Sequence, residues 1–240
     1  MQAIIMAGGK GTRLRPYTNI LPKPLLPVGN KSILDTNIKQ LALSGVDNII
    51  IAVGYLGEII ETVIGNGDKY GIKINYVYED KPLGTVGGLG LMKNLLEDQF
   101  IVMNGDILHD LDFEHLFQAH IHNKKHVTIT TYCQQHKLKL GVLEMKGENI
   151  TKYIEKPTNE YIVSLGIYVL DKYIINTYVK EKEYLDFPTL INLIIQEKKN
   201  ISSYMHNGLW IDIGTTEEYL NLIDNLDKII EENPLVPISI

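Results

Sequence analysis

The chain of 240 residues is 45% hydrophobic and 22% charged, which is the composition of an ordinary globular protein. This composition excludes a disordered chain, a collagen-like chain and a small domain held together by disulfides. The 23 basic and 29 acidic residues give a net charge of −6, which argues against a polybasic membrane-binding surface and against a nucleic-acid partner.

The first half of the chain alternates predicted strands and helices. We expect strands at residues 2–6, 48–53, 73–79 and 100–104, and helices beginning at Ser32 and spanning about 56–64 and 86–96. Asp35 stands three residues after Ser32, as in a helix N-terminal cap, and Gly45 marks the end of that helix. Such alternation predicts a parallel sheet with right-handed crossovers.

After Asp106 the pattern changes to strands joined by short connections. Residues 127–132, 141–145, 150–155 and 163–170 are predicted to be partly antiparallel additions to one mixed sheet. We therefore expect an α/β fold, with a Rossmann-like, mostly parallel mixed sheet flanked by helices and a small antiparallel β insertion.

The C-terminal segment is predicted to be one helix over 216–232. Thr215 and Glu218 form a capping box, and the chain turns at Asn233-Pro234. One face of this helix is apolar and carries Tyr219, Leu222, Ile223, Leu226, Ile229 and Ile230. The apolar tail 235–240 is expected to cover a groove or to join a subunit contact, so a homodimer is possible.

We expect one domain over 1–240. Within it, the half of alternating strands and helices would span about 1–110 and the strand-rich half about 111–215. The single cysteine, Cys133, cannot form an internal disulfide, and no run approaches the roughly 20 apolar residues that cross a bilayer. A signal-peptide pattern is also missing from the N-terminus, so a cytoplasmic protein without a membrane partner is expected.

A basic, glycine-rich stretch follows the first strand. It lacks the glycine spacing of a Walker loop and of a dinucleotide-binding fingerprint. Glycines nevertheless let backbone N–H groups approach phosphate oxygens, and Lys10, Arg13, Arg15 and Lys23 lie within or close to the loop. The stretch therefore predicts a polyphosphate ligand.

These motifs give the chain its resemblance to a known family. Gly-Gly-x-Gly-Thr-Arg-Leu at 8–14 and Pro-Lys-Pro at 22–24 are followed by Pro-Leu-Gly-Thr at 82–85, Asn-Gly-Asp at 104–106, Glu-Lys-Pro at 155–157 and Trp-Ile-Asp-Ile-Gly-Thr at 210–215. In this order they resemble the sugar-1-phosphate nucleotidylyltransferases, closest in pattern to short guanylyltransferases acting on mannose, heptose or glucosamine 1-phosphate. The resemblance implies the nucleotide-diphospho-sugar transferase fold, with a nucleotide-binding half over about 1–110 and a sugar-phosphate-binding half over about 111–215.

The resemblance also implies a reaction and its site residues. An NTP and a sugar 1-phosphate would give an NDP-sugar and pyrophosphate, with Mg²⁺ as cofactor, for surface glycan biosynthesis. Arg13, Lys23, Asp106 and Asp212 would be catalytic, and Asp106 and Asp212 would bind the metal. The nucleotide would contact Ala7, Gly8, Gly9, Gly11, Thr12, Arg13, Lys23, Glu79, Gly84 and Thr85, and the sugar phosphate would contact Gly141, Glu155, Lys156 and Ser164.

Two positions bear on specificity. Glu79 stands where thymidylyl- and uridylyl-transferring relatives often have glutamine, and a carboxylate suits the two adjacent donors of guanine, so GTP is favoured. Ser164 replaces an asparagine of many relatives, which leaves the acceptor open. The alternatives are a UTP- or dTTP-dependent glucose-1-phosphate enzyme, a CTP-dependent transferase acting on a non-sugar phosphate such as phosphocholine, and a non-catalytic NDP-sugar-binding regulator.

Overall fold

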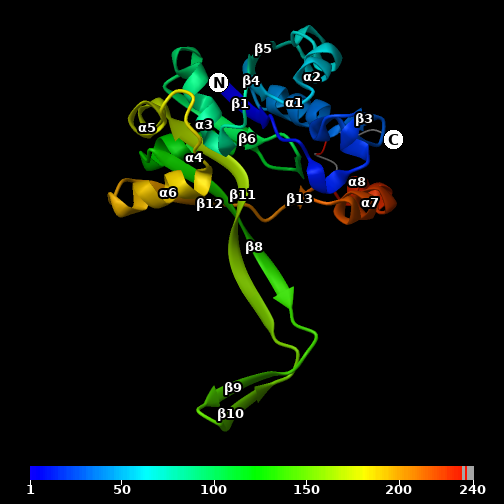
Figure 1. The fold of residues 1–240 in the computed structure, drawn as a ribbon, viewed down its shortest axis with the longest axis vertical. Helices are drawn as coiled ribbons and strands as arrows, with labels where there is room; N and C mark the ends of the chain where they lie inside the picture. The colour runs from blue at the N-terminus through cyan, green and yellow to red at the C-terminus, as the bar shows by residue number, and fades with distance from the viewer. Residues whose placement is uncertain (234–235, 237–240) are drawn as a thin grey trace.

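The computed structural model describes residues 1–233 and Val236. Its centre is a seven-stranded sheet in the order β12-β8-β11-β6-β1-β4-β5 (Figure 1). In this described part of the chain, three two-stranded sheets accompany it: β2–β3, β7–β13 and β9–β10. Four of the six strand pairings in the large sheet are parallel. The predicted α/β class, a mostly parallel mixed sheet with small antiparallel additions, is confirmed.

The strands of the first half lie within one residue of the predicted bounds. They are β1 (Gln2–Ala7), β4 (Asn48–Val53), β5 (Lys73–Tyr78) and β6 (Gln99–Asn104). At the centre of the sheet, Ile4 of β1 lies opposite Ile50 on one side and Val102 on the other. These central strands read as continuous apolar runs because helices cover both faces of the sheet.

Two hydrophobic cores lie on opposite faces of the sheet. One face is covered by α1 (Ile33–Leu43), α2 (Gly57–Ile64) and α4 (Phe113–Asn123), and the other by α3 (Gly84–Gly87), the 3₁₀ segment η5 (Gly88–Leu95), α5 (Lys172–Tyr178) and α6 (Phe187–Gln196). Because successive strand residues point to opposite faces, Ile5 joins the first core and Ile4 the second.

The predicted helix 86–96 is mostly a 3₁₀ segment, and its glycines account for the difference. A Cβ at Gly87 would lie 2.5 Å from the Glu183 carbonyl oxygen, and one at Gly90 would lie 2.8 Å from the Lys180 carbonyl oxygen. Residues without side chains are therefore required where this segment meets the 180–185 backbone, and glycine is a poor helix former.

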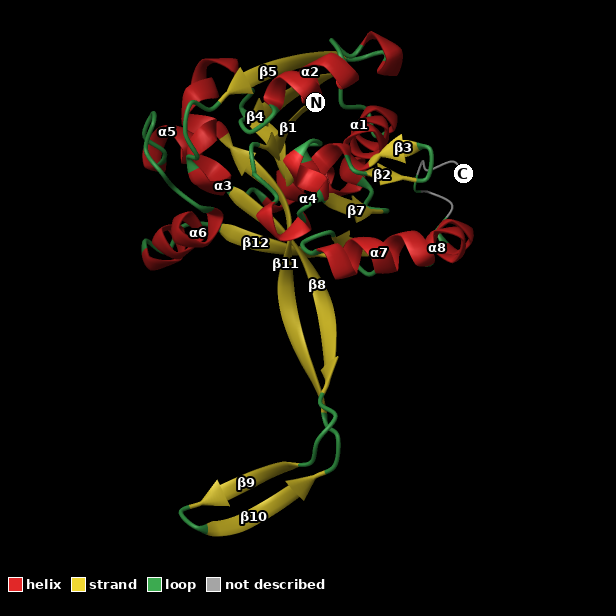
Figure 2. Cartoon of the chain, turned by 45° about the vertical axis from the view of Figure 1, so that its right-hand side comes forward, coloured by secondary structure: helices red, strands yellow, loops and turns green. Residues whose placement is uncertain are grey.

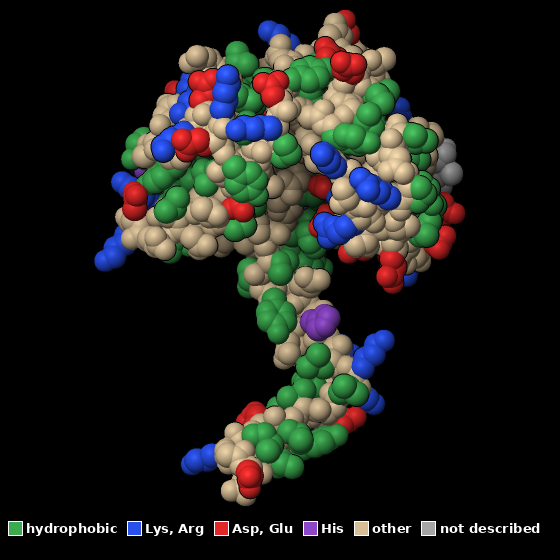
Figure 3. All heavy atoms as spheres, in the orientation of Figure 1, with side chains coloured by type: hydrophobic (Ala, Val, Ile, Leu, Met, Phe, Trp, Pro, Cys, Tyr) green, Lys and Arg blue, Asp and Glu red, His purple; other side chains and the backbone are tan. Residues whose placement is uncertain are grey.

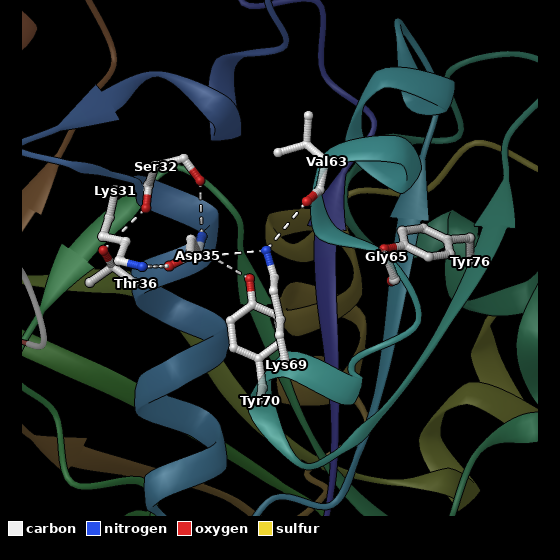
Figure 4. Close-up of polar contacts among 9 residues, drawn as sticks. All are labelled: Lys31, Ser32, Asp35, Thr36, Val63, Gly65, Lys69, Tyr70 and Tyr76. Carbon is white, nitrogen blue, oxygen red and sulfur yellow. Dashed lines mark hydrogen bonds and ion pairs between the residues drawn. The ribbon is translucent and has the colours of Figure 1, made fainter.

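The start of α1 is held by a polar cluster around Asp35 (Figure 4). The Ser32 hydroxyl accepts the Asp35 N–H at 3.1 Å, as the capping pattern predicts. The Asp35 carboxylate accepts a hydrogen bond from the Tyr70 hydroxyl at 2.6 Å and forms ion pairs with Lys69 at 3.3 Å and Lys31 at 3.6 Å. This cluster ties α1 to the turn before β5.

The second half adds strands of mixed direction. β8 (Val127–Lys137) and β11 (Thr158–Asp171) pair antiparallel, and β12 (Ile201–Met205) runs parallel to β8 at the edge. The predicted strands 127–132 and 163–170 are therefore antiparallel parts of the mixed sheet, as expected, but both are longer. The β8–β11 register is irregular between Ser164 and Tyr168.

The β8–β11 ribbon leaves the body of the protein and ends in a small hairpin (Figures 1 and 2). That hairpin consists of β9 (Val142–Lys146) and β10 (Asn149–Ile154), which pair only with each other. The expectation that 141–145 and 150–155 belong to the mixed sheet is therefore wrong. Their sequence periodicity predicts strands but contains no information about which strand they pair with.

After β12, the described chain continues with one strand and two helices. β7 (Ile107–His109) pairs antiparallel with β13 (Trp210–Asp212), and two helices follow, α7 (Thr216–Asp224) and α8 (Leu226–Glu232). The single helix predicted over 216–232 is thus interrupted at Asn225. Of the apolar tail, only Val236 is described, and it is buried in a further hydrophobic core that also contains Tyr219 and Leu222. The remainder of the tail lies outside the described residues.

The remaining elements are short. They are the 3₁₀ turns η1 (Thr12–Leu14), η2 (Tyr17–Asn19), η3 (Lys23–Leu25) and η4 (Asp68–Tyr70) and the strands β2 (Pro27–Val28) and β3 (Lys31–Ser32). Among the described residues, no helix has the length and apolar character needed to cross a membrane.

Candidate active site

A pocket of about 360 Å³ lies at the carboxyl ends of β1 and β6. Ligands of open α/β sheets bind at this edge. The face in Figure 3 is hollowed between two flanks, and basic side chains gather beside acidic ones at its margin. The pocket is lined by Met6, Ala7, Gly8, Gly9, Lys23, Pro24, Glu79, Pro82, Gly84, Thr85, Asn104, Asp106 and Tyr184.

The glycine loop leaves β1 directly into this pocket. A Cβ at Gly9 would meet no atom within 4 Å, so its backbone borders open space. Gly11 has φ +57°, and a Cβ there would lie 2.9 Å from the Thr18 methyl group. The Thr18 hydroxyl donates to the Gly11 carbonyl oxygen at 2.8 Å. The loop is therefore held in a shape that requires glycine, with backbone free to approach a ligand.

Lys10, Thr12 and Arg15 are exposed and do not line the pocket. Arg13 is also exposed, but its guanidinium lies near Gly214, where a Cβ would be 3.6 Å from Nη2. The Thr216 hydroxyl donates to the Arg13 carbonyl oxygen at 3.3 Å. The glycine loop and the segment before α7 are thus joined, although about 200 residues separate them.

Lys23 and Asp106 meet at the base of the pocket. Prolines on either side of Lys23 fix the backbone at η3, and the Lys23 ammonium forms an ion pair with the Asp106 carboxylate. Asp106 directly follows β6 through the turn into β7. The structure therefore brings together two of the predicted catalytic residues.

Asp212 is placed beside Asp106 by strand pairing. It lies opposite Ile107 in the β7–β13 pair, and the Ile213 N–H donates to the Asp106 carbonyl oxygen at 3.3 Å. Desolvation raises the pKa of Asp212, the charge of Asp106 raises it further, and Lys23 and Arg13 oppose the rise. The two carboxylates therefore repel each other and would accept a cation between them.

Glu79 points into the pocket from the end of β5. Its carboxylate lies between two glycines: a Cβ at Gly8 would be 3.5 Å from Oε2, and one at Gly88 would be 2.2 Å from Oε1. Oε2 accepts the Leu83 N–H at 3.3 Å. Burial raises the pKa of Glu79, and the Leu83 hydrogen bond partly offsets the rise. The carboxylate is consequently a half-buried acceptor at the pocket wall.

Gly84 and Thr85 shape the wall that faces this carboxylate. Gly84 has φ +83°, and a Cβ there would lie 2.4 Å from the Leu185 carbonyl oxygen. The Thr85 hydroxyl accepts the Phe187 N–H at 2.9 Å. Sequence reasoning missed Tyr184, which lines the pocket from the loop before α6. No motif in the sequence surrounds this tyrosine, so its sequence offered no signal.

A second recess of about 170 Å³ adjoins the pocket at Asn104. It contains the predicted Ser164 and Asp212, together with Trp210 and Gly166. The Ser164 hydroxyl donates to the Tyr168 hydroxyl oxygen at 3.2 Å. Asn104 and Trp210 were not among the predicted site residues, although both lie in recognisable motifs, at 104–106 and 210–215.

Three of the four predicted sugar-phosphate residues do not reach either recess. Gly141, Glu155 and Lys156 lie in the connections between the β8–β11 ribbon and its terminal hairpin, away from the body (Figures 1 and 2). There Lys156 forms an ion pair with Glu155 at 3.4 Å, and Glu155 accepts the Tyr153 hydroxyl at 2.9 Å. The structure places the Glu-Lys-Pro motif on an exposed projection, away from the pocket of the same chain.

Comparison with known proteins agrees with this architecture. The family model described as nucleotidyl transferase matches residues 2–229. A mannose-1-phosphate guanyltransferase of Yarrowia lipolytica is 34% identical, with 100% of this chain and 68% of the relative aligned. A mannose-1-phosphate guanylyltransferase catalytic subunit beta of Xenopus tropicalis is also 34% identical, with 92% and 63% aligned. The chain thus spans about two thirds of the length of these curated relatives.

Solved structures share the fold. A putative glucose-1-phosphate thymidylyltransferase from Bacillus anthracis has a TM-score of 0.75 at 23% identity, with 100% of this chain and 97% of that chain covered. HddC from Yersinia pseudotuberculosis has a TM-score of 0.71 at 24% identity, with 93% and 98% covered. With the family model matching nearly its whole length, the chain belongs to the nucleotidyl transferase family.

Proposed function

We propose that this protein is a guanylyltransferase that joins GTP and a sugar 1-phosphate, mannose 1-phosphate foremost, to give a GDP-sugar and pyrophosphate. The observation that carries the choice of GTP is the Glu79 carboxylate at the pocket wall, next to the glycine loop. Guanine presents N1–H and an exocyclic amino group as adjacent donors, and a carboxylate is an acceptor only. The similarity to mannose-1-phosphate guanyltransferases supports the same assignment.

The chemistry requires positioning and charge neutralisation rather than a covalent intermediate. An oxygen of the sugar phosphate attacks the α-phosphorus of GTP, a phosphorus–oxygen bond forms, and pyrophosphate leaves as the bond to the β-phosphate oxygen breaks. The backbone N–H groups of the glycine loop bind the triphosphate, and Arg13 and Lys23 neutralise charge that develops at the α-phosphate and on the leaving pyrophosphate.

Asp106 and Asp212 fit a Mg²⁺ site. Asp106 lies in the turn before β7, and Asp212 ends β13, the strand that pairs with β7. Burial raises the pKa of Asp212 and the charge of Asp106 raises it further, against the opposing charges of Lys23 and Arg13, which supports a cation between the two carboxylates. Oxygen ligands of this kind, with phosphate oxygens and water completing the shell, are what Mg²⁺ prefers. When bound, Mg²⁺ would neutralise the triphosphate. The Lys23 ammonium, released from Asp106, would then be available to phosphate.

We place the reaction in the cytoplasm, as a supply of activated sugar for surface glycans. The lone thiol of Cys133 is half-buried and unpaired, which suits a reducing compartment. The acceptor would lie in the recess of Ser164 and Trp210, which adjoins the nucleotide pocket at Asn104. Because this recess opens beside Asp212, an acceptor phosphate there would approach the α-phosphorus.

The experiment measures pyrophosphate release with Mg²⁺ for GTP, UTP, dTTP, CTP and ATP against the 1-phosphates of mannose, glucose, glucosamine and heptose, and against phosphocholine. We expect turnover with GTP and mannose 1-phosphate. Turnover only with UTP or dTTP, or only with CTP and phosphocholine, would keep the reaction class and refute the guanine assignment. Nucleotide-sugar binding without turnover on any pair would identify a regulator instead.

Two variants test the residue roles in that assay. Glu79→Gln replaces one acceptor oxygen by a donor, so we expect kcat/KM for GTP to fall about 10- to 150-fold, as the loss of a hydrogen bond to a charged group worth about 1.5–3 kcal/mol implies. Asp106→Asn should lower turnover by about 100-fold or more. Glu58→Gln, at an exposed position of α2, is the matched control and should behave as wild type. Full activity of Glu79→Gln would refute its role in reading the base.

A further inference from the structure

The arm, defined as residues 133–163, has no core of its own. None of these residues, all of which the structure describes, is buried. Seven large apolar side chains are exposed along it: Leu140, Leu143, Met145, Ile150, Tyr153, Tyr161 and Ile162. They make up a third of the twenty-one such side chains in the described residues, although the arm is about an eighth of the chain. A two-stranded ribbon is marginally stable alone in water, so this surface requires a cover.

The arm leaves the body in a defined direction. At its base Gly166 has φ +74°, and a Cβ there would lie 2.6 Å from the Asn104 amide nitrogen. The Trp210 indole N–H donates to the Leu165 carbonyl oxygen at 3.2 Å. Beyond this anchor, β11 and β8 stay paired from Ser164 to Thr158. Six extended residues span about 20 Å, so the arm carries its end on the order of 20 Å from its own recess.

The recess itself is short of positive charge. Among the described residues that line the pocket and the adjoining recess, Lys23 is the sole cation, and Asp106 already pairs with it. Asp212 adds a further negative charge. A sugar 1-phosphate is a dianion, so an acceptor in this recess would meet acidic surroundings. Because Mg²⁺, Arg13 and Lys23 are assigned above to the triphosphate, a further cation for the acceptor phosphate would come from outside this recess.

The end of the arm carries an excess of positive charge. Residues 137–157 contain five lysines and three glutamates, whereas the whole chain has a net charge of −6. Lys156 stands where the ribbon meets the terminal hairpin, at φ +46°, and its side chain is exposed. The acidic recess and the basic end of the arm are complementary in charge, but in one copy of the chain they are held apart.

We propose that two copies of this chain exchange arms, so that the arm of one covers the recess of the other and delivers Lys156 to the acceptor phosphate there. This inference rests on the proposed function. In a dimer with a two-fold axis, each arm covers the recess of the other chain, because the axis repeats the same contact in both directions. If each apolar side chain of the arm exposes about 100 Å², one arm offers about 700 Å², close to the roughly 800 Å² per partner of a stable interface.

A mixed dimer of two defective chains tests the exchange. Lys156→Ala and Asp106→Asn chains carry different affinity tags, are co-expressed, and are purified through both tags. In an arm-exchanged dimer, the intact body of the Lys156→Ala chain receives the intact arm of its partner, so one site of two is complete. We expect about half of the wild-type turnover per dimer, whereas each variant alone has at most a few per cent. Lys39→Ala, at an exposed position of α1 on the body, is the control for removing a lysine.

Each result decides the question. A mixed dimer as inactive as its parents would show that each arm serves its own body, and normal activity of Lys156→Ala alone would remove its role. If the wild type has no turnover, the proposed function fails, and sedimentation still tests the exchange. Ile150→Asp on the arm should then convert a dimer into a monomer, while Ile195→Asp on α6 should not. A wild-type monomer at micromolar concentration would overturn the proposal.

Discussion

Acidification should destabilise this protein through His109, which is fully buried on β7. Its Nδ1 accepts the Leu111 N–H at 3.2 Å, and its Nε2 has no hydrogen-bond partner. Burial lowers the pKa of His109 to about 3, and the neighbouring His206 acts in the same direction. Asp110 lies 3.0 Å from His206 and does not reach His109 through a hydrogen bond or ion pair. The imidazole is therefore neutral in the folded state.

The sign and size follow from proton linkage. A histidine in the unfolded chain titrates near pH 6.5, so below this pH the unfolded state binds a proton that the folded state excludes. The contribution of His109 to the free energy of unfolding is thus complete above pH 6.5 and is lost as the pH falls towards 3. Between pH 7 and pH 5 the loss is about 2 kcal/mol, with about 1.4 kcal/mol more for the next pH unit.

Urea unfolding at pH 7, 6 and 5 measures this loss, and His109→Asn is the comparison. Asparagine keeps an acceptor for the Leu111 N–H and does not titrate. Its free energy of unfolding should therefore change about 2 kcal/mol less than that of the wild type between pH 7 and pH 5. Because β7 pairs with the strand that carries Asp212, activity should fall over the same range. Parallel pH profiles for the two proteins would refute the argument.

Two further substitutions test local structure by thermal unfolding. Gly166→Ala should lower the free energy of unfolding by more than the roughly 1–2 kcal/mol of left-handed backbone strain, because its Cβ would also meet Asn104 at 2.6 Å. Gly147→Ala, at φ +64° with no atom within 4 Å of its Cβ, should show the backbone strain alone, and equal losses would contradict the steric argument. Thr215→Ala removes the hydroxyl that accepts the Glu218 N–H at 3.2 Å and should cost about 1 kcal/mol. The exposed Glu217→Ala is its control, and an unchanged melting temperature for Thr215→Ala would exclude a stabilising cap.

Local patterns predicted much of the body. The strand from Gln2 was visible as an apolar run, and the N-terminal cap at Ser32 as a polar residue before a helical periodicity, because both signals lie within a few residues. The helix expected at 86–96 could not be predicted correctly from local patterns. Its glycines are required because the 180–185 backbone packs against them, and nothing near them in the sequence identifies that neighbour.

Some pocket residues were predictable from local motifs, and others were placed by tertiary contacts alone. Lys23, Glu79 and Asp106 were identified from motifs and do line one pocket, because strand ends of a parallel sheet meet at one edge. Tyr184 was missed, since a loop brings it to the pocket and no pattern marks it. The approach of Asp212 to Asp106 depends on the β7–β13 pairing, which no local pattern specifies.

Residues close in the sequence therefore sufficed to predict the α/β class, the glycine loop and most of the residues that line the pocket. Hydrophobic periodicity, glycine spacing and helix capping all depend on short-range interactions. The direction of the β8–β11 ribbon and the separation of Lys156 from Ser164 required the fold. They depend on how Gly166, Asn104 and Trp210 pack at the base of the arm, and contacts between distant segments leave no periodic trace in the chain.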